Sequence, residues 1–322
     1  MQLQETRNYG VNQIIKRYAR FPWYKPLPVH LEHGWTPDEF ALKSDLLTRK
    51  PLMLVYSKRR AAAWKKKSKT PVAIMGSPFI HFKNMNHIAK KKKAKGTIAF
   101  PGHSTYDLDS NFSLEQYCRQ LKKLSAKYQP ITICLFWFDF VEKADAYRKF
   151  GFNVVTTGYK FSTGLSFVKN FYKILSAHKY ATSNEIGSHT FYAVDLGLPF
   201  FLTGEKPLVI NVGNDVNADK PTHADDFKYG AIATRLFDTG PVTKISPAQK
   251  KFVESEMGLK DCLSKSEMHK LLTQYDASYQ SFGRAILYLI ESAILKIVLN
   301  GPWGKSVVSA RKKIVRKQKS RS

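Results

Sequence analysis

The sequence has few cysteines, few acidic residues and no long apolar run. Its three cysteines are Cys118, Cys134 and Cys262. They are too few for a disulfide framework and their spacing matches no zinc site, so we expect a reducing compartment. The first ten residues contain no apolar segment typical of a secretory signal. The longest apolar stretch, 285–299, includes Glu291 and Lys296 and is shorter than the roughly 20 residues of a membrane span.

Acidic residues are outnumbered by basic ones, 25 to 52, which gives a net charge of +27. A charge of this size calls for a polyanionic neighbour, such as nucleic acid, an anionic membrane or a phosphate-bearing substrate. Three runs without an acidic residue, 58–69, 90–95 and 311–321, hold 19 of the basic residues and leave +8 for the rest. The excess charge is therefore concentrated in patches. The 43% hydrophobic content is enough for a folded core.

Short apolar strands alternate with helix-length segments along most of the chain. Strands are predicted at 28–32, 52–56, 72–75, 97–100, 131–138, 153–157, 180–183 and 199–202. This order is typical of an α/β fold with a parallel sheet covered on both faces. We expect a short N-terminal α/β domain at 1–95, a Rossmann-like domain at 96–245, and a C-terminal part at 246–322. The last part contains a predicted amphipathic helix, 282–299, and a basic tail.

Two polar loops follow predicted strands of the Rossmann-like domain. The first offers Gly102, His103, Ser104 and Thr105, and the second offers Ser183, Asn184, Glu185, Gly187, Ser188 and His189. Parallel strands end at one edge of a sheet, and a helix that begins near Ser188 would point its positive end at the same edge. The loops therefore predict a phosphate-binding site. The alternative is a pair of ordinary turns with capping side chains. Neither a P-loop nor a GxGxxG motif occurs.

A histidine in the N-terminal part is a third candidate. His33 follows a predicted strand within the sequence Glu32-His33-Gly34-Trp35 and could face the two loops across a cleft. Histidine suits general-base catalysis near neutral pH, and Glu32 is a second candidate for that role. The alternative is a structural histidine. The segment 107–109 has the letters of a DxD metal motif, but we interpret it as a solvated turn and expect no metal site.

Residues 180–202 resemble the nucleotide-binding region of GT-B glycosyltransferases, and in particular of CDP-glycerol glycerophosphotransferases and capsule-type transferases. The matching residues are Ser183, Gly187, Ser188 and Phe191, followed by Gly197 and Pro199. The pair His33-Gly34 is similar to the His–Gly motif of that group, and 100–109 resembles a segment of transferase-like proteins of lipopolysaccharide and O-antigen biosynthesis. The sequence departs from the family's His–Pro dipeptide, in whose place it has Phe136-Trp137-Phe138-Asp139, and the N-terminal half is short for a full Rossmann domain.

The resemblance implies two Rossmann-like domains and a metal-independent glycosyltransferase. In that family the loop at 183–189 holds the donor's phosphates, and the histidine matching His33 is a candidate base. We therefore expect transfer from a nucleotide-sugar to a growing, lipid-linked bacterial surface glycan. No resident cofactor is expected. The alternatives are a nucleic-acid-binding protein, which lacks the support of a helix-turn-helix, zinc or RNP motif here, and a non-catalytic scaffold.

The basic runs predict attachment to an anionic membrane. The expected membrane-binding residues are Lys58, Arg59, Arg60, Lys65, Arg311, Lys312 and Lys313, with Trp64 and Trp303 as interfacial anchors. Such attachment would place the protein in the cytoplasm, peripheral on the inner face of the cytoplasmic membrane. Solvated lysine-rich loops are the alternative.

Overall fold

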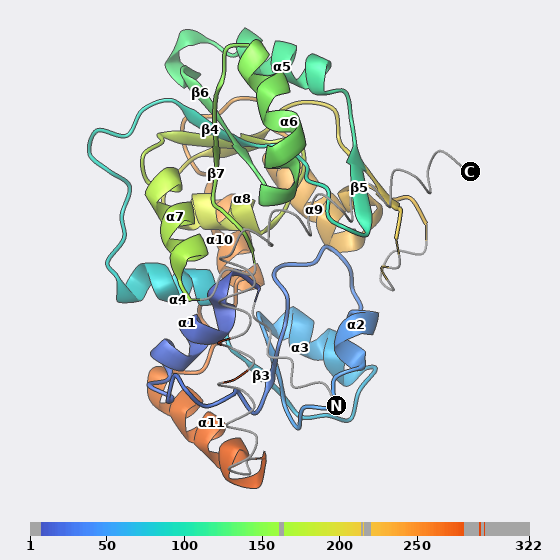
Figure 1. Ribbon diagram of the computed structural model, residues 1–322, viewed down its shortest axis with the longest axis vertical. Coiled ribbons are helices and arrows are strands. Elements are labelled where there is room, and N and C mark those ends of the chain that lie inside the picture. The colour runs from blue at the N-terminus through green and yellow to red at the C-terminus, as the bar shows by residue number, and fades with distance from the viewer. Residues whose placement is uncertain are drawn as a thin grey trace.

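The computed structural model describes residues 8–160, 164–213, 215, 220–279, 290 and 293. Figure 1 shows two α/β lobes, one above the other, each built on its own parallel sheet. One hydrophobic cluster runs through both lobes, because Ile14 and Leu54 below belong to the same buried core as Phe191 and Phe200 above. The predicted α/β class with parallel sheets is therefore confirmed, and the predicted domain limits stay a prediction.

The lower lobe holds a three-stranded sheet. Its strands, in the order β1-β2-β3, are β1 His30–Leu31, β2 Met53–Val55 and β3 Val72–Ile74, all parallel. The helical elements are η1 Asn8–Gly10, α1 Val11–Tyr18, α2 Lys43–Leu46, α3 Lys58–Lys65 and α4 Pro78–Met85. The buried strand residues are all apolar, as expected for strands whose two faces are covered.

The upper lobe is a doubly wound parallel sheet. Its strands, in the order β7-β6-β4-β8-β9, are β7 Asn153–Thr156, β6 Ile131–Leu135, β4 Thr97–Phe100, β8 Tyr180–Ser183 and β9 Phe200–Leu202. The crossover helices are α5 Leu114–Lys123, α6 Trp137–Lys149, α7 Ser166–Leu175 and α8 Ser188–Asp195. From β4 the chain builds outward to one edge and then returns to build β8 and β9 on the other side. The gap between β4 and β8 is therefore the topological switch point, where open α/β sheets bind ligands.

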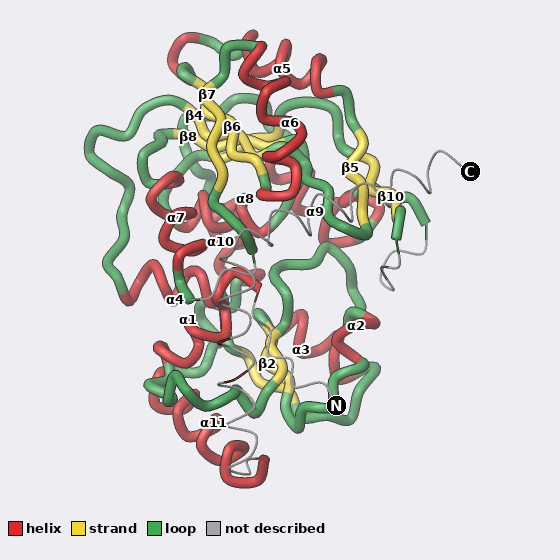
Figure 2. The backbone as a smooth tube through the Cα atoms, in the orientation of Figure 1, coloured by secondary structure: helices red, strands yellow, loops and turns green. Residues whose placement is uncertain are grey.

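Two sequence-based element assignments need correction. The segment predicted as a solvated turn at 107–109 enters strand β5, Leu108–Asn111, which pairs antiparallel with β10, Leu208–Asn211. The predicted strand at 131–138 ends at Leu135, and helix α6 begins at Trp137. Figure 2 shows the β5–β10 ribbon standing apart from the main sheet.

The C-terminal helices tie the lobes together. They are η3 Ala224–Asp226, α9 Lys228–Phe237, α10 Pro247–Glu256 and α11 Lys265–Tyr279. Helix α10 contacts α8, whereas α11 lies beside the lower lobe, where Lys25 forms an ion pair with Asp276 at 2.8 Å (Figure 1). None of the helices that the described residues form has the length and apolar surface needed to cross a bilayer. The predicted amphipathic helix and the basic tail, with Trp303, Arg311, Lys312 and Lys313, lie outside the described residues.

Candidate functional site

The two predicted loops meet at the switch point of the upper sheet. The backbone N–H of Gly102, after β4, donates to Oδ1 of Asn184, after β8, over 2.7 Å. Asn184 is almost fully buried, and its Nδ2 donates to the carbonyl of Glu205 over 3.0 Å. The expectation that both loops lie at one sheet edge is confirmed. The Asn184 side chain links the two loops, so its role at the site is structural.

The β8 loop leads into helix α8, whose N-cap residue forms no side-chain hydrogen bond. Ser183 Oγ donates to the carbonyl of Phe100 over 2.5 Å and accepts the N–H of Glu185 over 3.1 Å, which fixes the loop's turn. Helix α8 begins at Ser188, and because residue 187 is glycine the helix has no side-chain N-cap. The N–H of Thr190 donates to the carbonyl of Gly187 over 3.0 Å, so the N–H groups of Ser188 and His189 and the positive dipole end of the first turn remain suited to an anion.

The β4 loop is held by its own side chains. Ser104 is buried, its N–H donates to Asp139 Oδ2 over 2.8 Å, and its Oγ donates to Asp109 Oδ1 over 3.0 Å. Thr105 Oγ1 accepts the backbone N–H of Leu108 over 3.1 Å. Both residues were predicted to bind the donor, but their polar groups are engaged within the protein. We therefore correct their role to one of loop support.

Gly102 is required for packing. A Cβ atom at this position would lie 2.7 Å from Ser110 Oγ and 2.8 Å from Pro207 Cγ, closer than such contacts allow. The sequence suggested that this glycine admits a ligand close to the backbone. The structure shows protein atoms in that space, so Gly102 is a packing glycine and its place in the predicted donor site is corrected.

His103 is the member of the β4 loop that remains accessible. Its side chain is 41% exposed, and its ring packs on Phe136 with the ring centres 4.5 Å apart. Nδ1 of His103 lies 3.6 Å from Oε1 of Glu185. This distance is longer than a hydrogen bond. The pair joins a histidine from one loop to a carboxylate from the other.

The His33 loop reaches the same helix N-terminus from the lower lobe. The N–H of Trp35 donates to Ser188 Oγ over 3.0 Å, and Gly34, at φ +69°, brings its backbone against the same hydroxyl. Nε1 of Trp35 donates to Oε2 of the buried Glu256 on α10 over 2.6 Å, which anchors the loop. All three candidate segments therefore converge at the start of α8, as the sequence suggested for His33 and the two loops.

The ring of His33 is neutral at pH 7. The residue is exposed at the surface, and the protein atoms packed around its ring, together with the nearby charge of Lys160, lower the pKa of His33 to about 4. Nδ1 of His33 accepts from Nδ2 of Asn8 over 3.2 Å, because an amide NH₂ group can only donate. From this contact we assign the ring proton to Nε2.

The turn that presents Asn8 is strained and tightly packed. Tyr9 has the left-handed conformation, φ 60° and ψ 10°, which is costly for an aromatic residue. Its N–H donates to the carbonyl of Lys160 over 2.7 Å, and its ring stacks on His33 with centres 5.6 Å apart. A Cβ at Gly10 would lie 2.2 Å from the carbonyl of Gly164, so glycine is needed there. Backbone strain of this sort is typical of functional sites.

Glu32 cannot act as the base. Only 2% of the residue is exposed, one carboxylate oxygen pairs with Arg60 Nε, and the other accepts the N–H of Tyr56 over 2.9 Å. Both oxygens are thus engaged away from solvent, and the sequence-based role for Glu32 is corrected to a structural one.

The ring of His189 packs among aromatic side chains. Its ring lies beside those of Phe100 and Phe200, at centre distances of 5.1 and 6.1 Å, and Nε2 is buried with no hydrogen-bond partner among the described atoms. Burial lowers the pKa of His189 to about 4. The ring is partly exposed and lies near Glu185 and His103, so its predicted contact with a donor stays a prediction.

The first basic run divides into buried and exposed members. Arg59 pairs with Glu256 over 2.6 Å and Arg60 is 3% exposed, where it pairs with Glu32. Trp64 is also buried and donates to the carbonyl of Thr70 over 2.9 Å. These three residues cannot contact a membrane surface, so their predicted role is wrong. Lys58 and Lys65 are exposed and remain compatible with it.

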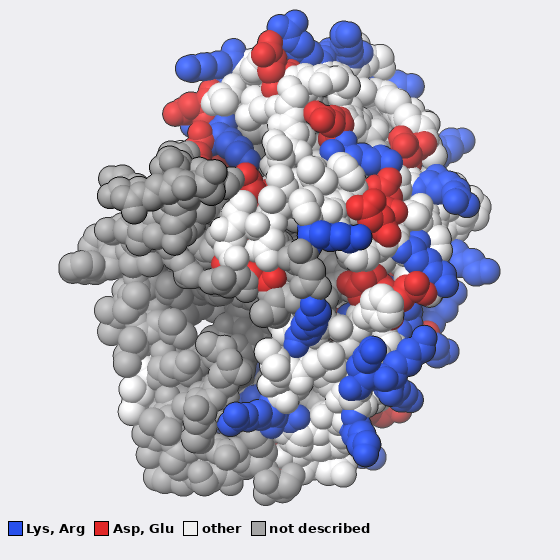
Figure 3. Space-filling view, turned by 90° about the vertical axis from the view of Figure 1, so that its right-hand side faces the viewer, with Lys and Arg blue, Asp and Glu red and all other residues white. Residues whose placement is uncertain are grey.

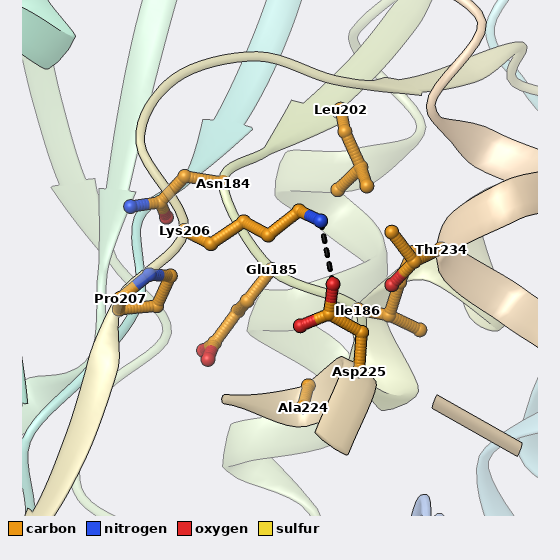
Figure 4. A pocket seen from close by; sticks show the side chains of 9 residues that line it. All are labelled: Asn184, Glu185, Ile186, Leu202, Lys206, Pro207, Ala224, Asp225 and Thr234. Carbon is orange, nitrogen blue, oxygen red and sulfur yellow. Dashed lines mark hydrogen bonds and ion pairs between the residues drawn. The ribbon is translucent and has the colours of Figure 1, made fainter. Parts of the chain in front are cut away.

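A small open pocket of about 230 Å³ lies behind the β8 loop (Figure 4). Asn184 and Glu185 form one wall, and the Lys206–Asp225 ion pair, 2.5 Å long, crosses the opposite side. Sequence reasoning missed Lys206 and Asp225, and it also missed Asn8 and Tyr9. No local pattern marks any of them, because each reaches the site through folding. Within the described residues, no group of three His, Cys, Asp or Glu side chains could hold a metal ion.

Comparison with known proteins gives little. No family model and no curated protein matches the chain. A solved structure of the wall teichoic acid polymerase TagF is similar over 85% of this chain and 69% of that chain, with 9% sequence identity and a TM-score of 0.37. A structure of a single-substitution variant of that polymerase has a TM-score of 0.30 over the same shares, also at 9% identity. Similarity at this level carries no argument about fold or function.

Proposed function

We propose that the protein is a glycosyltransferase that binds the phosphates of a nucleotide-sugar at the start of α8. One observation carries the proposal: three segments distant in sequence converge there, at the switch point of a doubly wound sheet. Switch points are where open α/β sheets bind their ligands, and an uncapped helix N-terminus favours phosphate among those ligands. Two histidines, His33 and His103, belong to the converging segments.

In this proposal the backbone holds the donor and His33 stabilises the leaving group. The N–H groups of the first turn of α8 bind a phosphate oxygen, and the Nε2–H of His33 donates to the oxygen on which negative charge develops. Such fixed donors contribute strongly to catalysis, because they need no rearrangement as the charge forms. A neutral ring with a pKa of about 4 suits this role and is poorly matched to general-base work at pH 7.

We assign His103 as the group that accepts the proton of the acceptor hydroxyl. The acceptor hydroxyl oxygen forms a bond to the sugar's anomeric carbon, and the bond from that carbon to the phosphate oxygen breaks. The nucleoside diphosphate leaves with the electron pair, and the hydroxyl proton passes to His103, whose Nδ1 faces the Glu185 carboxylate. A carboxylate behind a histidine orients the ring toward its proton donor. The reaction requires no resident metal or cofactor.

The acceptor is proposed to be a growing, lipid-linked glycan of the bacterial surface. In that case the enzyme works in the cytoplasm, peripheral on the inner face of the membrane. The exposed part of the basic runs supports this placement, since Lys65 and its neighbours remain at the surface.

A nucleotide panel tests the proposal. Thermal unfolding is measured with CMP, CDP, UMP, UDP, GMP and GDP, each at a concentration far above micromolar. A diphosphate at about 100 times its Kd adds about 2.7 kcal/mol of stability, which raises the Tm of a chain of this size by several degrees. We expect one diphosphate to do so and its monophosphate to do less. Equal Tm values with every nucleotide would contradict a nucleotide-binding function and favour a non-catalytic scaffold.

A further inference from the structure

The lower lobe exposes two large apolar side chains beside its basic run. Phe40 is 62% exposed and Leu47 is 69% exposed, on the segment that contains α2. Single exposed apolar side chains are common, but apolar side chains that share a surface with a ring of polar residues mark interaction sites. Neither residue belongs to the candidate site at the start of α8, so the proposed reaction does not account for them.

Phe40 and Leu47 lie next to α3. The carbonyl of Phe40 accepts from Nη1 of the buried Arg60 over 2.8 Å. Ala41 and Leu46, which adjoin the two exposed residues in sequence, pack in one apolar cluster with Trp64 of α3. Figure 1 shows α2 and α3 side by side at the lower right of the molecule. The exposed apolar pair and the exposed lysines of α3 therefore belong to one surface.

This surface is mainly basic, and the two acidic residues just before Phe40, Asp38 and Glu39, pair with Arg60 and Lys228 over 3.1 Å each. Its exposed basic residues are Lys43, Arg49, Lys65, Lys66, Lys67 and Lys69. The one acidic residue between positions 40 and 70 is Asp45, which is 5% exposed and contacts His30 over 2.9 Å. Figure 3 faces this side, and Lys and Arg side chains gather over its lower part. We call Phe40, Leu47 and these six basic residues the docking face.

We propose that the docking face binds the surface of an anionic lipid bilayer, with Phe40 and Leu47 inserted among the lipids and the basic side chains on the headgroups. Nucleic acid shares the negative charge, but it offers no apolar layer to cover a protruding leucine. A bilayer satisfies both features at once, since apolar burial and attraction to anionic lipid add together at a membrane surface. The docking face takes over the membrane-binding role that the sequence predicted for Arg59, Arg60 and Trp64, because the fold buries those three residues.

Phe40 of the docking face is also close in sequence to His33 of the candidate site. Phe40 is seven residues after His33, and seven residues span at most about 25 Å. A bilayer held at Phe40 would therefore bring a lipid-linked acceptor close to the cleft. In this respect the inference rests on the proposed function, although lipid binding itself does not depend on catalysis.

Vesicle sedimentation with the full chain tests the inference. Vesicles contain phosphatidylcholine alone or with about one-third phosphatidylglycerol, at about 0.15 M salt. We expect binding to the anionic vesicles and at least a tenfold weaker partition for the double variant Phe40→Ser/Leu47→Ser, by the usual value of buried apolar area. The matched control is Val141→Ser on α6, because Val141 is 72% exposed and lies in the upper lobe. This control should bind like the unchanged protein.

A charge-reversal pair provides the second arm. The triple variant Lys65→Glu/Lys66→Glu/Lys67→Glu should lose at least about 100-fold in partition, since each basic residue near an anionic surface contributes about fivefold. The equal charge change at the exposed Lys122, Lys123 and Lys127, in and after α5, should cost far less. Unchanged vesicle binding by the Phe40/Leu47 variant, equal loss in both charge variants, or binding to RNA but not to vesicles would overturn the proposal. Because nucleotides are absent, the outcome is independent of the nucleotide panel.

Discussion

Replacing His33 with alanine is expected to lower kcat about 100- to 1000-fold while the donor's Kd changes much less. The reason is that the alanine variant loses one fixed hydrogen-bond donor to the leaving phosphate, and donors of this kind have effects of that size. The measurement is release of nucleoside diphosphate under saturating donor, with donor affinity determined separately by calorimetry.

The variant His33→Gln separates the two possible roles of this side chain. Glutamine can donate an N–H but cannot accept a proton at pH 7, so a donor role predicts recovery to within about tenfold of the original kcat. Equal inactivity of the glutamine and alanine variants would instead identify His33 as a base, as the sequence suggested. That result would contradict the assignment of the ring proton to Nε2.

The same assignment predicts a pH effect for Asn8→Asp. A carboxylate at position 8 accepts from Nδ1–H and favours the charged ring, so it raises the pKa of His33 above its present value of about 4. In the neutral ring of the variant the proton sits on Nδ1, so Nε2 no longer donates to the leaving group above that pKa. The variant should therefore lose kcat at pH 7 and recover part of it as pH falls through the raised pKa, where Nε2 is protonated again, and nitrogen NMR at pH 7 should show the ring proton on Nδ1.

Replacing Glu256 with alanine is expected to have the largest effect on stability. Glu256 is buried, accepts from Trp35 Nε1 over 2.6 Å, and pairs with Arg59 over 2.6 Å. Its loss leaves the Arg59 guanidinium buried without its carboxylate, which typically costs about 3 to 5 kcal/mol. Denaturant unfolding measures this directly.

The loss of Glu256 should also release the His33 loop, because Trp35 would keep only its backbone bond to Ser188. We therefore expect weaker nucleotide binding in the fraction that remains folded. Glu254→Ala is the matched control on the same helix, since that carboxylate forms a surface pair with Lys260. It should change stability little. Similar unfolding curves for the two variants would contradict the anchoring role of Glu256.

The sequence predicts the limits of strands in the upper sheet well where proline, glycine or a polar loop follows the strand. Strands at 97–100 and 180–183 have the predicted limits because Pro101-Gly102 and a polar loop stop them. The strand at 131–138 was predicted three residues too long, since the apolar run continues through Phe136 into α6 without a change in composition. The ribbon strand β5 was missed because its partner, β10, lies about a hundred residues away.

The sequence identified the segments that form the candidate site, but it assigned several of their residues the wrong roles. Ser104 and Glu32 have the chemistry of site residues, and only the fold shows that Asp109 and Arg60 already occupy their polar atoms. The same holds for Arg59, whose partner Glu256 is 197 residues away. Hydrogen-bond partners distant in sequence are invisible to local patterns. Asn8 and its effect on the His33 tautomer could not have been found without the structure.

Calorimetric titration of the most stabilising diphosphate into the variant Ser188→Asp tests the central claim most directly. An aspartate at this position favours the start of α8 and can still accept the N–H of Trp35, so the variant should stay folded. Its charge would occupy the place proposed for the donor's phosphate. The matched control is Ser246→Asp, at the exposed N-cap of α10. We expect Kd to rise at least about 100-fold in the first variant and to stay unchanged in the second. Unchanged affinity in Ser188→Asp would contradict phosphate binding at the start of α8.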